Sequence, residues 1–383
     1  MGHCSSSQPC SEPTRPTRQN TDDSSKKRCK GCKGGVRDDW VASSMVDMRK
    51  VPGHEKRMQQ MGVPWAASVG RVCRTGKKPH GGHCNQDSWF VRCSETSSSV
   101  YGVFDGHGVK GHLVSDHVKQ LLPKMLPDSL RRQGCNRKEE AGIAAFESLH
   151  ESVLQQTHLG AVNSGTTATL VMHDHASESL DIFSVGDSSA ALLSRNEHGG
   201  LIGRRLTVDH KPEDPKERAR IEAAGGSVRF DGYCHRVVKR FRDEPGLNMS
   251  RSIGDKVAHK VCGVSAKPDC HCVQLKSEDV ALLICSDGIW EVLSEQEAAD
   301  IIAAYSYKGP QMAAMALADE AQLRWEVGTR GTTIDDITVL LVALGPSDSA
   351  STELKSDAST ATTTFSIDFD TSPDPSWSEC SSD

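Results

Sequence analysis

The sequence VFDGHG, at residues 103–108, ends a run of apolar and aromatic residues with an acid, Asp105, that glycine follows at once. The run 99–104 is short and rich in Val, Tyr and Phe, which is typical of a buried strand. The same arrangement, an acid beside one end of an apolar run, recurs at Asp87, Asp187, Asp287 and Asp335.

A single acid beside glycine is explained by a turn, because Asp and Gly both favour turns. Several such acids at the ends of buried strands would gather like charges at one edge of a core, which is costly unless a positive group neutralises them. Mg²⁺ and Mn²⁺ prefer oxygen ligands and suit carboxylates that lack Cys or clustered His beside them. The pattern therefore favours a divalent-metal site, and a set of ordinary turns remains the alternative.

Helical patterns separate the predicted strands. They cover residues 109–125, 137–156, 215–224, 294–304 and 311–325. Ser294 and Glu297 form the S-x-x-E pattern of a capping box at the start of one of them. Tight turns between the runs 166–172, 180–185 and 190–194 indicate antiparallel meanders. We therefore expect an α+β sandwich in which helices cover the outer faces of the sheets.

Composition excludes several classes of protein. The 383 residues carry a formal charge of −6. The residues between the two terminal segments have no basic stripe of the kind that a nucleic-acid-binding protein would show, which argues against a nucleic-acid scaffold. The longest apolar stretches fall far short of the ~20 residues of a spanning helix, and no apolar segment of a secretory signal follows Met1. The 14 cysteines stand in a chain too long for a disulfide scaffold, so we expect reduced thiols.

The N-terminus, MGHCSSS, carries a signal for lipid attachment. Gly2 and Ser6 match the pattern for N-myristoylation, and Cys4 is a candidate for palmitoylation. One acyl chain binds a bilayer only marginally, but Cys4 and the basic cluster at residues 26–33 would reinforce it. We expect attachment to the cytoplasmic face of a membrane; an arm that merely begins with Met-Gly is the alternative.

The charge distribution divides the chain into four parts. Residues 1–38 hold eight Lys and Arg against four acids and form a basic, disordered arm; residues 346–383 hold eight acids against one Lys and form a disordered Ser/Thr-rich tail. Residues 39–63 are an extension with the pattern of a short amphipathic helix. Residues 64–345 remain as the catalytic domain.

The chain resembles the metal-dependent protein phosphatases, the type 2C serine/threonine phosphatases. The resemblance rests on nine short sequence blocks that occur in the same order as in that family. The matching blocks are NQD at 85–87, VFDGHG at 103–108, SGTTA at 164–168, VGDS at 185–188, LTVDHKP at 206–212, RIEAAGG at 220–226, SRSIGD at 250–255, SDGIW at 286–290 and DDITV at 335–339. They extend over most of residues 65–344.

The resemblance implies a four-layer αββα sandwich with two central, mainly antiparallel sheets and a site for two divalent ions. It implies that Asp105 bridges both ions, that Asp87 and the Gly106 carbonyl serve one, and that Asp287 and Asp335 serve the other. Asp187 would serve a weaker third ion. Residues 214–246 resemble the mobile flap of the family.

Two ions can activate a bridging water for direct attack on phosphorus, so no covalent phosphoenzyme is required. His107 is our candidate for the acid that protonates the leaving alkoxide, and a hydrogen bond to a metal-bound carboxylate is its alternative role. The phosphate-binding arginine of the family has no clear counterpart, and Lys77 or Lys78 is expected to replace it. Glu291 stands where relatives often have Asp, which affects the third ion, and Asp336 replaces a usual Asn, which we expect to matter little.

The leading hypothesis is therefore a monomeric Mg²⁺- or Mn²⁺-dependent phosphatase that removes phosphate from phosphoserine and phosphothreonine in proteins at a membrane surface. A pseudophosphatase, acting as a membrane-anchored binding module, is the alternative; the retained acids and His107 argue against it. A phosphatase acting on another phosphoester is a third hypothesis.

Overall fold

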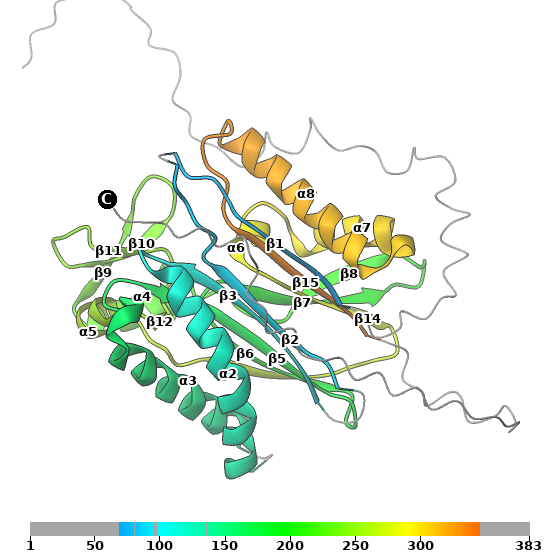
Figure 1. Cartoon of the computed structure of the whole chain (residues 1–383), viewed down its shortest axis with the longest axis horizontal. Coiled ribbons are helices and arrows are strands. Elements are labelled where there is room, and N and C mark those ends of the chain that lie inside the picture. Colours follow the sequence, from blue (N-terminus) through cyan, green and yellow to red (C-terminus); the bar gives the residue numbers. More distant parts are fainter. Residues whose placement is uncertain (1–68, 80, 95–97, 135–136, 345–383) are drawn as a thin grey trace, which may run out of the picture. The chain divides into compact units, whose positions relative to one another are not determined.

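The computed structural model describes residues 69–79, 81–94, 98–134 and 137–344. The expected basic arm with Gly2 and Cys4, the extension at 39–63 and the acidic tail from residue 346 lie outside these residues. Two large antiparallel sheets form the centre of the described part (Figure 1). This confirms the expected α+β class.

The first sheet has five strands. Their spatial order is β1 (Val69–Arg74), β15 (Ile337–Ala343), β14 (Asp279–Cys285), β7 (Ser189–Arg195) and β8 (Leu201–Arg205). Each neighbouring pair is antiparallel, and Cys285 lies opposite Val339 in the central ladder. The predicted strands at 190–194, 280–285 and 337–344 are therefore confirmed, with small differences at their ends.

The second sheet is built around β3, which contains the VFDGHG sequence. Its order is β12 (Ile253–Gly254), β4 (Gly165–Thr166), β3 (Ser98–His107), β5 (Ala168–Asp174), β6 (Ser179–Val185) and β13 (Asp269–Gln274), and β2 (Asp87–Arg92) pairs with β3. All these ladders are antiparallel. The expected antiparallel meander is found for β5 and β6, but β7 does not continue it, because β7 lies in the first sheet between β14 and β8.

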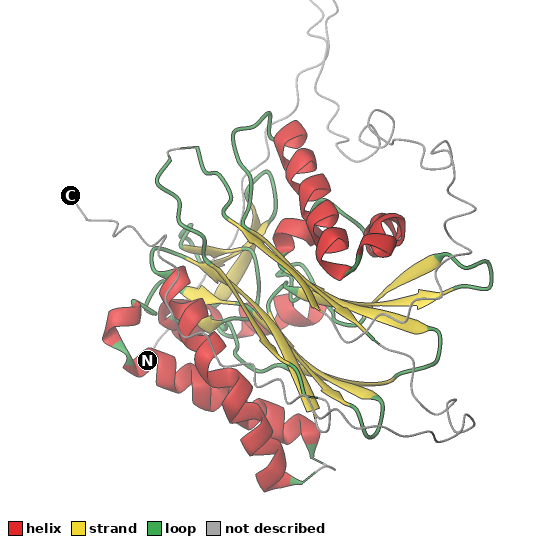
Figure 2. Ribbon diagram, turned by 45° about the vertical axis from the view of Figure 1, so that its right-hand side comes forward, coloured by secondary structure: helices red, strands yellow, loops and turns green. Residues whose placement is uncertain are grey.

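Helices cover the outer face of each sheet, which gives the four layers (Figure 2). On the second sheet, α2 (Gly111–Gln133) and α3 (Lys138–Gln155) pack with residues such as Phe146 against Phe104 and Phe183. On the first sheet, α7 (Glu295–Tyr305) and α8 (Pro310–Gly328) pack against Leu283 and Leu341. A third apolar core, with Ile182 and Leu340, lies between the sheets.

The helices follow their predicted signals with one difference. Ser294 and Glu297 form the capping box of α7. However, α2 continues through Pro123 and Pro127 to Gln133, beyond the end expected near residue 125. Tertiary packing explains the extra turns, because Leu126 is fully buried and Ser129 donates a hydrogen bond to the Ala141 carbonyl of α3 (2.9 Å). None of the described helices is long and apolar enough to span a bilayer.

A smaller unit is built mainly from residues between β8 and β12 in the chain, where the flap was expected. It contains α4 (Pro215–Ala223), the three-stranded sheet of β9 (Gly226–Phe230), β10 (His235–Lys239) and β11 (Pro245–Leu247), and α5 (Lys256–Cys262). It has its own core around Ile221, Val237 and Cys262. The remaining short helices are η2 (Thr157–Leu159), α6 (Asp287–Trp290) and η3 (Ser306–Lys308).

Candidate active site

The β2–β3 ladder places two of the predicted acids side by side. Asp87 begins β2 and lies directly opposite Asp105 in the register of the two strands. The main chain of Asp105 is held by Thr167, whose hydroxyl accepts a hydrogen bond from the Asp105 amide (2.9 Å) and whose amide donates to the Asp105 carbonyl (2.8 Å). The strand register therefore fixes the separation of these two carboxylates without any contribution from a loop.

The first sheet brings two further acids to the same end. Asp287 begins α6 directly after β14, and Asp335 lies two residues before β15. Ser286 connects the two sheets, because its hydroxyl donates to Asp87 Oδ2 (2.8 Å) and accepts from the Thr338 amide (3.0 Å). The acids that stand far apart in the sequence thus lie in one region of the fold.

Mutual repulsion in this region is evident from the pKa shifts. Burial, followed by the charges of Asp87, Asp287 and Asp335, raises the pKa of Asp105 well above its usual range. Burial and Asp187 raise the pKa of Asp287 in the same way, and burial and Asp336 raise that of Asp87. Because their pKa values are raised, Asp87, Asp105 and Asp287 need a positive partner to stay ionised at neutral pH.

The residues fit hard divalent ions in type. Asp87 Oδ1 is buried and has no hydrogen-bond partner among the described residues, so a carboxylate oxygen is free to bind a ligand. Oxygen donors dominate the region, which suits Mg²⁺ or Mn²⁺. In the described ranges no three His, Cys, Asp or Glu side chains already enclose a common centre. The ligand assignments of Asp87, Asp105, Asp287 and Asp335 therefore stay predictions.

Gly106 provides close backbone approach beside Asp105. A Cβ at this position would lie 2.4 Å from the carbonyl oxygen of Gly111 and 2.6 Å from that of Gln86. Only glycine lets β3 pass between the start of α2 and the NQD segment. The assignment of the Gly106 carbonyl as a metal ligand stays a prediction, as it does for the carboxylates.

His107 contacts a residue that sequence reasoning missed. Its Nε2 lies 2.6 Å from Oδ2 of the buried Asp255, which also accepts a hydrogen bond from the Ser252 hydroxyl (2.6 Å). Burial lowers the pKa of His107, but Asp255 outweighs this effect and the net shift is upward. His107 Nδ1 is buried and without a partner in the described part of the chain. The SRSIGD block was the signal that could have identified Asp255.

The structure separates the two candidate phosphate-binding lysines. Lys78 Nζ lies 2.8 Å from Asp335 Oδ1, whereas Lys77 Nζ donates to the Gly331 carbonyl (2.8 Å). Lys77 forms an isolated antiparallel β-bridge with Ile334. In extended backbone, successive side chains point to opposite faces, so we expect Lys77 and Lys78 to point in opposite directions. Burial lowers the pKa of Lys78, but Asp335 and its neighbours outweigh this, so the ammonium stays charged beside the acids.

Asp336 has a larger role than the sequence suggested. One of its oxygens accepts hydrogen bonds from the Gly76 amide (2.7 Å) and His83 Nε2 (2.9 Å), and the other accepts from the Gln86 amide (2.8 Å). The side chain is thus bound to the segment with Lys78 and to the segment with Asp87. Whether Asp in place of the usual Asn matters little therefore stays a prediction, tested below through these contacts.

Asp187, the residue expected at a third ion, lies beside a cation of the chain. It is 1% exposed, and its Oδ2 is 2.6 Å from the Lys211 ammonium. The same ammonium lies 3.9 Å from Glu291 Oε1. Glu291 also accepts a hydrogen bond from the hydroxyl of Tyr233, in the flap (3.2 Å). The third-ion role of Asp187 stays a prediction.

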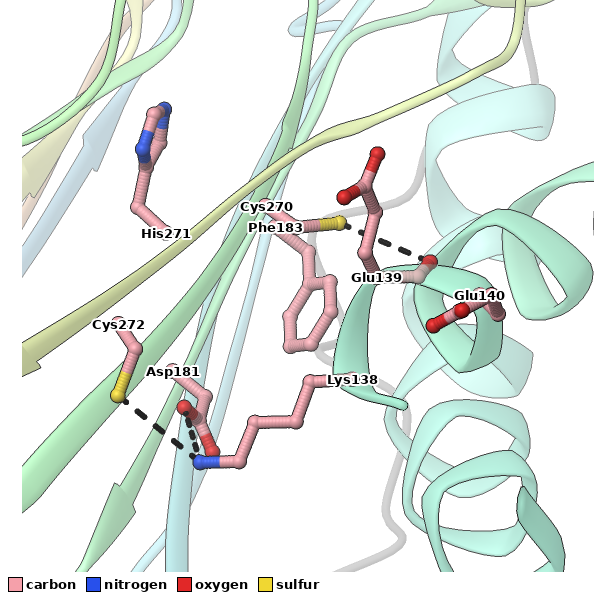
Figure 3. A pocket seen from close by; sticks show the side chains of 8 residues that line it. All are labelled: Lys138, Glu139, Glu140, Asp181, Phe183, Cys270, His271 and Cys272. Atoms are coloured by element: carbon pink, nitrogen blue, oxygen red, sulfur yellow. Dashed lines mark hydrogen bonds and ion pairs between the residues drawn. The ribbon is translucent and has the colours of Figure 1, made fainter. Parts of the chain in front are cut away.

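A cavity of about 440 Å³ lies elsewhere, between the start of α3 and the strands β6 and β13 (Figure 3). Its lining includes Lys138, Asp181, Cys270 and Cys272 but none of the predicted site residues. Lys138 is paired with Asp181 (2.7 Å), and His271 points away from the two cysteines, as Figure 3 shows. This cavity is separate from the acid cluster.

Comparison with known proteins agrees with these findings. Residues 66–327 match the family model for protein phosphatase 2C. "Probable protein phosphatase 2C 64" of Oryza sativa subsp. japonica is 34% identical over 68% of this chain and 62% of its own length, and "Probable protein phosphatase 2C 48" of the same plant is 31% identical over 80% of this chain and 92% of its own. "Probable protein phosphatase 2C 6" of Arabidopsis thaliana is 29% identical, and the alignment spans 61% of it, so the match leaves more than a third of two of these relatives uncovered.

Solved structures share the fold. A serine-threonine phosphatase 2C from Toxoplasma gondii has a TM-score of 0.60 at 22% identity and is covered over 98% of its length by 73% of this chain. A C. elegans sex determining protein has a TM-score of 0.61 at 23% identity, over 74% of this chain and 66% of its own. The four-layer architecture, the ordered sequence blocks and the match over most of the central region lead to one conclusion: the chain belongs to the protein phosphatase 2C family.

Proposed function

We propose that this protein is a Mg²⁺- or Mn²⁺-dependent phosphatase that hydrolyses phosphoserine and phosphothreonine in proteins. The observation that carries the proposal is the register of β2 and β3, which sets Asp87 opposite Asp105 at the end of the fold where Asp287 and Asp335 also lie. Family membership supports the reaction class.

In this proposal Asp87, Asp105, Asp287, Asp335 and the Gly106 carbonyl would hold the two ions. When bound, such ions supply an activated water and positive charge for the phosphoryl oxygens. Ser286 holds Asp87 in place through its hydrogen bond to Oδ2. The shared end of two rigid sheets suits this role, because sites on strands hold their geometry more closely than sites on loops.

Two side chains act on the substrate itself. Lys78 binds the substrate phosphate, exchanging its contact with Asp335 for phosphoryl oxygens. His107 gives a proton to the departing serine or threonine oxygen. Asp255 engages Nε2, so Nδ1 is the ring nitrogen available for that transfer. The pseudophosphatase alternative receives no support from the described site, where each predicted acid and His107 are present.

We also propose that the protein acts as a monomer at the cytoplasmic face of a membrane, held by acyl groups on Gly2 and Cys4. The sequence pattern and the basic cluster at 26–33 support this location. Gly2→Ala should move the protein from the membrane fraction to the soluble fraction. An unchanged distribution of that variant would contradict the anchor.

The reaction is tested with a phosphothreonine peptide and purified protein. We expect release of phosphate that requires added Mn²⁺ or Mg²⁺ and stops with a chelator. Asp105→Asn should abolish it, whereas Asp116→Asn, at a half-exposed position of α2 where the carboxylate pairs with Lys119 and Gln120, should not. Turnover by the metal-free protein would contradict the proposal.

A further inference from the structure

The loop that leads into the flap is tied to the turn that carries Asp187. The Gly186 amide donates to His210 Nδ1 (3.0 Å), and the His210 amide donates to the Gly186 carbonyl (3.0 Å). The His210 carbonyl accepts from the Ser250 amide (2.7 Å), and the ring is 2% exposed. These contacts lock the main chain at residue 210. The backbone of Lys211 therefore lies close to the Asp187 turn whatever rotamer its side chain adopts.

Two acids lie beside the ammonium of Lys211, and a third, Asp287, acts on it through its charge. Its Nζ lies 2.6 Å from Asp187 Oδ2 and 3.9 Å from Glu291 Oε1. Burial lowers the pKa of Lys211, but Asp187, Asp287 and Glu291 outweigh it and the net shift is strongly upward. The flap closes this side, since the Tyr233 hydroxyl donates to Glu291 Oε2 (3.2 Å).

Asp187 is the residue expected at a third divalent ion, and Glu291 beside the same ammonium would affect that ion. An ion entering here must displace a positive group that is covalently part of the chain, and a tethered group competes at a high effective concentration. We infer that the ammonium of Lys211 takes the place of the third divalent ion, so that the chain binds two ions and supplies the third positive charge itself. This inference rests on the proposed two-ion function and replaces the weaker third ion expected from the resemblance.

Removal of the ammonium should open the place to a metal. Asp187 Oδ1 is buried and has no partner in the described ranges, so a carboxylate that lost Lys211 would present both of its oxygens. Glu291 would then repel Asp187 without the ammonium that now lies beside both. Mn²⁺ would relieve that repulsion, because it is a hard cation that accepts carboxylate oxygens.

The test counts Mn²⁺ ions bound per chain, from the electron paramagnetic resonance signal of free Mn²⁺ during titration. We expect two ions for the wild type, three for Lys211→Met and two for Lys211→Arg, which keeps the charge. Lys216→Met, which removes an exposed lysine of α4, should also bind two. If circular dichroism shows that Lys211→Met is unfolded, Lys211→Gln replaces it with the same expected gain.

Three ions on the wild type, or two on the folded uncharged variants, would overturn the inference while leaving the two-ion function standing. A wild-type protein that binds no Mn²⁺ would overturn the proposed function and the inference together. The count therefore distinguishes the two failures, and it does not depend on enzymatic turnover.

Discussion

The carboxylate of Asp255 and the imidazole of His107 meet at 2.6 Å, between Oδ2 and Nε2, although 148 residues separate them in the chain. Asp255 adopts a left-handed backbone conformation (φ 47°) before α5. The Ser252 hydroxyl donates a hydrogen bond to Asp255 Oδ2, the same oxygen that contacts His107. The carboxylate orients the ring and leaves Nδ1 as the free nitrogen. Asp255 is thus a positioning residue for His107.

This relationship predicts a dependence on the leaving group. His107→Gln should lower kcat for a phosphothreonine peptide by about 10²- to 10⁴-fold, because the alkoxide then departs without an acid. The loss with p-nitrophenyl phosphate should be far smaller, since that leaving group needs no proton. Asp255→Asn should follow the same pattern more weakly. Equal losses on both substrates would contradict the role of the pair.

The two lysines of the sequence GKK should differ in effect. Lys78→Ala should raise KM for the phosphopeptide by about 10- to 100-fold, the value of a lost charge-assisted hydrogen bond. Lys77→Ala should change KM by no more than about twofold, because its ammonium binds the Gly331 carbonyl away from the acids. Steady-state kinetics of the two variants decide between them. A larger effect at Lys77 would show that the assignment is reversed.

Asp336 should influence metal affinity without binding the metal. Asp336→Ala removes the acceptor for the Gly76 and Gln86 amides, so the segments with Lys78 and Asp87 lose their common support. Mutation of residues that position metal ligands typically lowers metal affinity by about 10- to 100-fold, and we expect a loss of this size in the affinity for Mn²⁺. Asp336→Asn, which keeps an acceptor, should fall between. Unchanged Mn²⁺ affinity of the alanine variant would disprove the role.

The flap is fastened by a pH-dependent contact. Glu217 of α4 accepts hydrogen bonds from Arg251 (2.7 Å), Ser250 (2.6 Å) and Arg220 (2.6 Å). Burial raises the pKa of Glu217, but these three partners outweigh it and lower the pKa from 4.5 to about 2. Because the pKa of Glu217 is lower in the folded protein than in the unfolded chain, its ionised carboxylate stabilises the fold. This contribution is fully present above pH 4.5 and is lost as the pH falls towards 2.

Glu217→Gln should therefore be less stable than the wild type at pH 6, and the difference should shrink as the pH falls through this window. Urea unfolding at pH 6 and pH 3.5 measures it. Glu222→Gln, an exposed position on the same helix, should keep the pH dependence of the wild type. Parallel curves for wild type and Glu217→Gln would argue against the contact.

The local pattern of the sequence predicted the strands and the acids at their ends. Runs such as 280–285 are apolar because they are buried on both faces, and the acids beside them lie at the strand ends and are themselves buried. The length of α2 was underestimated, since the cost of Pro123 and Pro127 is local whereas the packing of Leu126 and Ser129 that offsets it is not.

The polar contacts of the site were beyond local reasoning. Lys211 and Asp187 are 24 residues apart, and Lys78 and Asp335 are 257 apart, so only the assembled sheets bring them together. The choice between Lys77 and Lys78 depends on the side-chain alternation set by the bridge to Ile334, which no spacing in the sequence reveals. The contacts of Asp336 with the Gly76 and Gln86 amides also join residues far apart in the sequence.

The most direct test of the two-ion centre is a Mn²⁺ titration of the metal-free protein and its Asp105→Asn variant, followed by calorimetry. Asp105 faces Asp87 and is the predicted bridge, so its loss should abolish high-affinity binding, while Asp116→Asn should bind as the wild type does. Tight Mn²⁺ binding by Asp105→Asn, equal to that of the wild type, would contradict the account.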